Sequence, residues 1–263
     1  MFRFFYLITL GFVLVCVCVA QDASPPSNSR GVIRLRVRVK VGDSTKGLSR
    51  KRFFLIKGSA EQNKPFIDTV EHQALLSRDC YYHRIGASDA LIKWLNESDC
   101  ESVYCREINS EDVSGPAAVP EFQSALTAGE KEFGSRDLAR KWLTVNLPEN
   151  IRDGFYQARQ SELRNLIKQA ETVSGASVIS VMGDRNGTAY FTDLEPGSYV
   201  ISSILPIEIG DSFVTWNCAV SVKPGDLATE RPLLISNKAD KNVKCVGVEK
   251  PLPVCDATSA KTK

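Results

Sequence analysis

Apolar and polar residues alternate strictly over residues 32–41, near the start of the chain. A period of two is typical of a β-strand with one buried face, because successive side chains point to opposite sides. The apolar residues predicted on the buried face are Ile33, Leu35, Val37, Val39 and Val41. The basic residues predicted on the other face are Arg34, Arg36, Arg38 and Lys40. This basic face is either an anion-binding stripe or a solvated face whose charges guard an edge strand against aggregation.

Helical spacing replaces the alternation between about residues 59 and 174. Ser88 is a suitable N-cap for a short helix over 87–95. Pro120 is placed to open a second helix, and a third is predicted over 135–143.

The longest helix is predicted over about 149–173, with Pro148 at its start and Gly175 directly after its end. Its apolar positions keep an approximate helical period. The period shifts between Phe155 and Leu163, which predicts a bend in the helix there.

Strands are predicted on both sides of the helical segment. A turn over 42–47 predicts that 52–57 returns as a strand beside the first. The turn over 183–187 contains Asn-Gly, which tolerates positive φ, and therefore predicts a hairpin. The remaining strands are predicted over 177–181, 188–191, 198–205, 212–222 and 231–235.

A longer motif covers this turn and the strands after it. It consists of Asp184-x-Asn186-Gly187-x-Ala189-x-Phe191-x-Asp193-Leu194-x-Pro196-Gly197-x-Tyr199-x-Ile201 and, later, Val220-x-Val222-x-Pro224-Gly225. The motif resembles the carboxypeptidase regulatory-like (prealbumin-like) domain family. The resemblance covers about 31–58 and 176–236 and leaves the insertion 59–174 unexplained. It implies an α+β fold, in which a seven-stranded antiparallel prealbumin-like β-sandwich is interrupted by a mainly helical insertion, and a module rather than an enzyme.

The first residues predict export. An apolar run over 4–20 follows Arg3, and small residues at Cys18 and Ala20 suit cleavage before Gln21. An uncleaved membrane anchor is the alternative, although the apolar core is at the short limit for a span. The predicted parts of the chain are a signal peptide over 1–20, a linker over 21–30, a β-sandwich formed by 31–58 and 175–237, a helical insertion over 59–174 and a Cys-containing C-terminal tail over 238–263.

Six cysteines remain once Cys16 and Cys18 leave with the signal peptide. An even number in an exported chain predicts disulfides. Their grouping along the sequence favours three pairs, which are Cys100 with Cys105, Cys218 with Cys245, and Cys80 with Cys255.

Two alternatives use these cysteines for chemistry. Cys80-x-x-His83 followed by Cys100 and Cys105 would supply four ligands of the kind that tetrahedral zinc takes. A free thiol would instead be a nucleophile, with His72 or His83 as its base.

Composition limits the classes of protein that fit. The 263 residues are 43% hydrophobic and 24% charged, which is ordinary for a soluble globular protein and not for a disordered, collagenous or polytopic membrane protein. A net charge of +2 gives no electrostatic reason to expect a nucleic-acid partner. The sequence contains no Gly-x-Ser-x-Gly elbow, phosphate loop, dinucleotide fingerprint or His-Glu-x-x-His motif.

We therefore expect a secreted or periplasmic, non-catalytic module with a binding or structural role at the cell envelope. We expect no cofactor and no catalytic residues, a protein or glycan partner, and no stable membrane span after signal cleavage. One alternative is a metal- or thiol-dependent enzyme built on Cys80, His83, Cys100 and Cys105. Another is an accessory subunit of an envelope complex that docks through the helical insertion.

Overall fold

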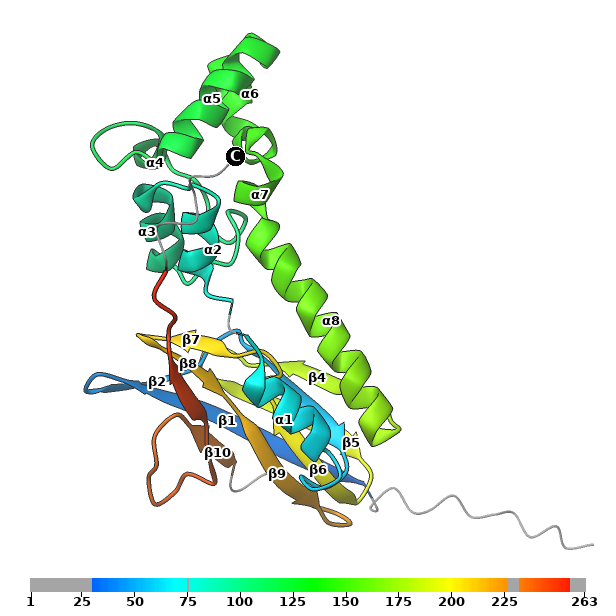
Figure 1. Cartoon of the computed structure of the whole chain (residues 1–263). Helices are drawn as coiled ribbons and strands as arrows, with labels where there is room; N and C mark the ends of the chain where they lie inside the picture. The colour runs from blue at the N-terminus through cyan, green and yellow to red at the C-terminus, as the bar shows by residue number, and fades with distance from the viewer. Residues whose placement is uncertain (1–29, 75, 227–231, 256–263) are drawn as a thin grey trace, which may run out of the picture.

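The computed structural model describes residues 30–74, 76–226 and 232–255. A β-sandwich and a unit of short helices are connected by the long helix α8 (Gly154–Ser174) and by the C-terminal segment (Figure 1). The predicted signal peptide and all of the predicted linker except Arg30 lie outside the described residues.

The first sheet is built around β1 (Gly31–Val41), the strand that the alternation predicts. One side of β1 pairs in parallel with β10, and β11 pairs in parallel with β10. The other side pairs antiparallel with β5 along the first half of β1 and with β2 along the second half. The other strands of this five-stranded sheet are β2 (Ser44–Gly47), β5 (Thr188–Leu194), β10 (Leu233–Ser236) and β11 (Cys245–Val246).

The second layer holds two smaller sheets, and all their strand pairs are antiparallel. The four-stranded sheet has the order β4-β3-β6-β9, and the three-stranded sheet has the order β12-β8-β7. Their strands are β3 (Arg52–Lys57), β4 (Ile179–Met182), β6 (Gly197–Ser202), β7 (Ile207–Ile209), β8 (Ser212–Thr215), β9 (Asn217–Val222) and β12 (Val248–Pro251).

The apolar face of β1 is buried between the layers, as its alternation predicts. Leu35, Val37 and Val39 are at most 1% exposed and share one core with Phe53 and Trp216 of the second layer. The indole Nε1 of Trp216 donates to the carbonyl oxygen of Ser236 over 2.9 Å, so the one polar atom of this large side chain is satisfied.

The expected seven-stranded antiparallel sandwich is not what the chain forms. The described strands are divided among three sheets, and the first sheet is mixed. β9 belongs to the four-stranded sheet, whereas β10 belongs to the first sheet, where it runs parallel to β1. The predicted tail over 238–263 contributes β11 and β12 to two of the sheets.

Both predicted hairpins are also wrong. Residues 52–57 form β3, but β3 pairs with β4 and β6 because β2, β5 and β10 already occupy both edges of β1. The Asn-Gly turn over 183–187 connects β4 to β5, which belong to different sheets. The turn exists, but it leads the chain from one layer to the other.

Two helices cover the outer face of the four-stranded sheet (Figure 1). α1 (Lys64–His72) and the C-terminal part of α8 pack on Phe54, Ile56 and Val200. Both ends of the predicted insertion are therefore part of the sandwich, and residues 78–152 form the helical unit.

The helical unit has its own core, which includes Tyr82, Leu91, Trp94, Phe122 and Phe155. The predicted helix over 87–95 is α3, where the hydroxyl of Ser88 accepts from the backbone N–H of Leu91 as expected of an N-cap. The elements of the unit are α2 (Arg78–Arg84), α3 (Asp89–Glu97), α4 (Ser110–Val113), α5 (Pro120–Phe133), α6 (Arg136–Lys141), the 3-10 helix η2 (Leu143–Asn146) and α7 (Glu149–Arg152).

The predicted longest helix is broken near its start. Between Phe155 and Leu163, where a bend is predicted, α8 is a continuous helix. Asp153, with φ −151° and ψ 6°, separates α7 from α8. This break lets α7 stay with the helical unit while α8 leaves it toward the sheet. Gly175 ends α8 in the left-handed conformation, as predicted.

The six cysteines are joined in the three pairs that the sequence favours. The Cα atoms are 5.6 Å apart in Cys100–Cys105, 5.7 Å in Cys218–Cys245 and 4.9 Å in Cys80–Cys255. The last pair fixes the C-terminal segment to α2 of the helical unit. Three disulfides indicate an oxidising, extracytoplasmic location.

Candidate functional site

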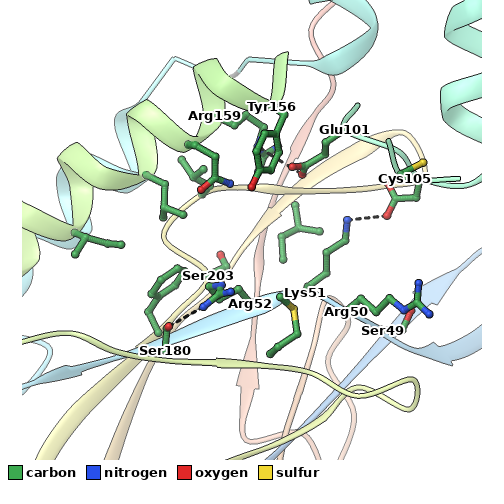
Figure 2. Close-up of a pocket in the computed structure, with 18 of the residues that line it drawn as sticks. Ser49, Arg50, Lys51, Arg52, Glu101, Cys105, Tyr156, Arg159, Ser180 and Ser203 are labelled. Carbon is green, nitrogen blue, oxygen red and sulfur yellow. Dashed lines mark hydrogen bonds and ion pairs between the residues drawn. The ribbon is translucent and has the colours of Figure 1, made fainter. Parts of the chain in front are cut away.

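A cleft of about 800 Å³ lies between the helical unit and the sandwich. The loop before β3, together with β3 and β4, forms one wall, and α8 with the loop after α3 forms the other (Figure 2). Because α8 passes from one unit to the other, it holds its cleft-facing side chains at fixed positions above the sheet.

The α8 wall is one face of the helix. Tyr156, Gln160, Leu163 and Ile167 line the cleft, and their spacing of four, three and four residues places them in one row. The hydroxyl of Tyr156, a residue that is 40% exposed, points into the cleft (Figure 2). Leu163 and Ile167 are half-buried and pack against the core beneath α8.

Part of the cleft lining is apolar. Phe54, Leu205 and Ile207 line the cleft and are themselves buried. Met182 of β4 also lines the cleft and is 51% exposed. Leu163, Ile167 and Met182 therefore offer apolar surface that a ligand could cover.

The cleft walls carry a strong excess of positive charge. Six cationic side chains line the cleft against two carboxylates, an excess of four in a chain whose net charge is only +2. The cations are Arg50, Lys51, Arg52, Arg159, Arg164 and Arg185, and the carboxylates are Asp99 and Glu101. Clustering of one sign in a cleft raises the local concentration of ions of the opposite sign.

Two of these cations are neutralised by the two carboxylates. Lys51 Nζ lies 2.7 Å from Asp99 Oδ2, and Arg159 Nε lies 3.8 Å from Glu101 Oε1. Arg159 also donates through Nη2 to the carbonyl oxygen of Pro206 over 3.0 Å. These ion pairs neutralise both carboxylates of the cleft walls.

The other four cations have no carboxylate partner among the described residues. Arg52 donates through Nη1 to the hydroxyl of Ser180 over 3.0 Å, which leaves its charge uncompensated (Figure 2). The side chains of Arg50, Arg164 and Arg185 are exposed and make no ion pair with any described residue. They are available to an anionic ligand.

The inner end of the cleft adjoins an ionic network centred on the buried side chain of Arg78. Its side chain is 9% exposed and lies 3.3 Å from Asp79, 3.5 Å from Asp99 and 3.7 Å from Glu208. Nη1 of Arg78 donates to the carbonyl oxygen of Cys100 over 3.1 Å. Since Arg78 belongs to α2 and Glu208 to β7, the network connects the helical unit to the sandwich.

Burial raises the pKa of Glu208 above its ordinary value of 4.5. The backbone N–H of Arg78, which donates to Oε1 over 3.0 Å, and the guanidinium charge of Arg78 oppose this rise. Desolvation is the larger effect, so the carboxyl group retains its proton to a higher pH than an exposed glutamate does.

The basic residues of β1 lie away from this cleft, on the face of the first sheet opposite the core. Arg34 and Arg36 are half-buried, whereas Arg38 and Lys40 are exposed. The guanidinium carbon of Arg34 lies 5.8 Å from the centre of the Tyr190 ring on the neighbouring strand β5. The arrangement is a basic face as predicted, and anion binding by it stays a prediction.

The four residues proposed for zinc are not brought together as a ligand set. Cys80 is bonded to Cys255, and Cys100 is bonded to Cys105. Nδ1 of His83 lies 3.9 Å from Asp89, and Nδ1 of His72 lies 2.7 Å from the carbonyl oxygen of Asp68. Within the described ranges, no group of three or more histidine, cysteine or acidic residues is placed to hold a metal ion.

Sequence reasoning missed the cleft. The run Arg50-Lys51-Arg52 was a visible signal, since three consecutive cations precede an apolar strand. The partners from α8 lie more than a hundred residues further along the chain, so nothing local connects the two walls.

No family model matches the chain, and no curated protein matches it. Among solved structures, the chain is similar to the pilus backbone protein RrgB of Streptococcus pneumoniae, at 12% identity and a TM-score of 0.24. The match covers 73% of this chain and 35% of the RrgB chain. The likeness is distant, and at this TM-score it supports no statement about function.

Proposed function

We propose that this chain is a non-catalytic binding module at the cell envelope, secreted or periplasmic, which holds its ligand in the cleft between the sandwich and the helical unit. The observation that carries the proposal is the excess of four positive charges in that cleft, with Arg50, Arg164 and Arg185 unpaired by described residues. Unpaired cations above apolar surface are a feature of a binding site rather than of a packed interface.

The cellular part of the proposal rests on the disulfides and on the sequence of the first twenty residues. Residues 1–20 have the features of a signal peptide. None of the described helices is both long and apolar enough to span a bilayer. The sandwich is proposed to be related to the carboxypeptidase regulatory-like domains, on the strength of the motif over 184–201.

The first experiment uses the fluorescent anion 8-anilinonaphthalene-1-sulfonate as the probe. We expect saturable binding to the purified, oxidised protein, and at least tenfold weaker binding to the double variant Arg164→Gln/Arg185→Gln. The control is Arg140→Gln, an exposed arginine on α6 that does not line the cleft. Equal binding by all three proteins would contradict a ligand site in the cleft.

A second candidate function is the accessory subunit. Leu138 of α6, Trp142 between α6 and η2, and Val145 of η2 follow at spacings of four and three residues, and they are 46%, 49% and 54% exposed. Such a row of exposed apolar side chains is typical of a contact surface for another protein. If this surface anchors the chain in a complex, Trp142→Ser releases a stoichiometric partner that co-purifies with the unaltered protein, and leaves the melting temperature unchanged.

A further inference from the structure

The same cleft has a second property besides its charge, which is that apolar side chains line it together with the unpaired cations. Arg164 and Arg185 are exposed side chains of the cleft walls. Leu163 and Ile167, which belong to the cleft-lining row of α8, are half-buried and pack against the core beneath the helix. A ligand that fills the cleft therefore meets charge on exposed side chains and hydrocarbon on more buried ones.

From this combination, and resting on the proposed function, we infer that the ligand is an amphiphilic anion: a phosphate or carboxylate head group that carries a hydrocarbon chain. Arginine suits the head group because its planar fork of donors matches phosphate and carboxylate oxygens. Met182 suits the hydrocarbon chain of the ligand, because an unbranched thioether adapts to a flexible apolar partner. Leu163 adds half-buried apolar surface beside it.

The size of the cleft agrees with such a ligand. About 800 Å³ falls within the range of roughly 300–1,000 Å³ that is usual for sites of small molecules. A free inorganic anion would leave the apolar part of the cleft unused, and a neutral detergent would leave four cations uncompensated.

The other features of the molecule support a ligand site less strongly than the cleft does. The disulfide-bonded cysteines offer no thiolate in the oxidised protein. The cleft is the site where geometry and charge select the same class of ligand.

Isothermal titration calorimetry with hexyl, octyl and decyl phosphate, below their micellar concentrations, tests the inference. If the chain is buried in the cleft, each added methylene tightens binding by about two- to fourfold. Octyl glucoside, which has the same chain length as octyl phosphate but no charge, is expected to bind at least tenfold more weakly than octyl phosphate. Inorganic phosphate is expected to bind more weakly than hexyl phosphate.

Two variants test where the hydrocarbon chain and the head group of the ligand bind. Met182→Ser is expected to weaken decyl phosphate more than hexyl phosphate, because Met182 is an exposed apolar side chain of the cleft. Arg164→Gln/Arg185→Gln is expected to weaken all three phosphates by at least tenfold, and Arg140→Gln to leave them unchanged.

The outcomes separate this inference from the proposed function. Binding of inorganic phosphate as tight as that of decyl phosphate would show a site for a free anion, which overturns the amphiphile and leaves the cleft as the binding site. Loss of alkyl phosphate binding in Arg36→Gln/Arg38→Gln, with no effect of the cleft variants, would place the site on β1 and overturn both.

Discussion

At the scale of single residues, Arg78 connects the helical unit to the sandwich. Its side chain is 9% exposed and lies within 4 Å of three carboxylates, Asp79, Asp99 and Glu208. A buried charge is tolerated when it is paired and hydrogen-bonded, and removal of one member leaves the others unpaired. Arg78 is therefore a structural residue beside the cleft rather than a ligand-binding one.

Arg78→Met is expected to lower the free energy of unfolding by about 3–5 kcal/mol, since Glu208 would keep a buried carboxylate without its cation. Urea denaturation at pH 7 measures the loss. Lys64→Met is the matched control, because the Lys64–Asp68 pair is exposed and such pairs contribute about 0–1 kcal/mol. A loss below about 1 kcal/mol in Arg78→Met would show that the network does not hold the interface.

Glu208 gives the protein a specific pH dependence. Its pKa is raised in the folded state, so between 4.5 and that raised value the folded protein holds a proton that the unfolded chain has lost. Stability from this group therefore falls as pH increases through the window. We expect the free energy of unfolding of the unaltered protein, relative to Glu208→Gln, to decrease from pH 4 upward and then to level off. A constant difference from pH 4 to pH 7 would contradict the raised pKa.

At the scale of elements, the turn over 183–187 decides how the two layers are connected. Oδ1 of Asp184 accepts from the backbone N–H groups of Asn186 and Thr188, each over 2.8 Å. Gly187 has φ +74°, and its backbone lies against β1, where the N–H of Val37 donates to the carbonyl oxygen of Gly187 over 2.8 Å. The motif therefore forms a turn that connects two sheets. The close contact between Gly187 and β1 is a feature that a simple hairpin would not require.

Gly187→Ala is expected to destabilise the protein by more than about 3 kcal/mol. A Cβ at this position would collide with the carbonyl oxygen of Val37, in addition to the cost of about 1–2 kcal/mol for a left-handed alanine. Gly134→Ala separates the two effects, because Gly134 has φ +63° with no atom within 4 Å of the added Cβ. It should lose only the conformational cost of about 1–2 kcal/mol in the same urea titration, and equal losses would rule out the collision.

At the scale of the whole molecule, three connections act beside the Lys51–Asp99 ion pair to hold the helical unit over the sandwich. They are the continuous helix α8, the Arg78 network and the Cys80–Cys255 disulfide, which fixes the segment that follows β12 to α2 (Figure 1). The cleft lies between the parts that these connections join. Its width therefore depends on all three.

Removal of Cys80–Cys255 is expected to cost more stability than removal of Cys100–Cys105. The first disulfide joins residues 175 apart and the second joins residues 5 apart. In the chain-entropy description this difference in loop length corresponds to about 3 kcal/mol. The measurement compares thermal unfolding of Cys80→Ser/Cys255→Ser with that of Cys100→Ser/Cys105→Ser. Equal melting temperatures would show that α8 and the Arg78 network fix the helical unit without the disulfide.

The sequence by itself determined the local features of this protein. The alternation in β1 defines which side chains enter the core, because the two faces of a strand are fixed by the backbone period. Ser88 and Gly175 define helix ends through the backbone groups that they satisfy or the φ value that they permit. The grouping of the cysteines favoured the three disulfide pairs that form, although six cysteines allow fifteen connectivities.

Tertiary structure decided which strands pair and where the cleft lies. A strand's sequence specifies its buried face but not its neighbour, because any strand offers the same backbone hydrogen bonds, and so β3 pairs with β4 and β6 instead of returning beside β1. The cleft depends on that choice. It forms only when α8 is packed over β3 and β4, which brings Arg164 to the same opening as Arg50 and Arg185, residues that no local pattern connects.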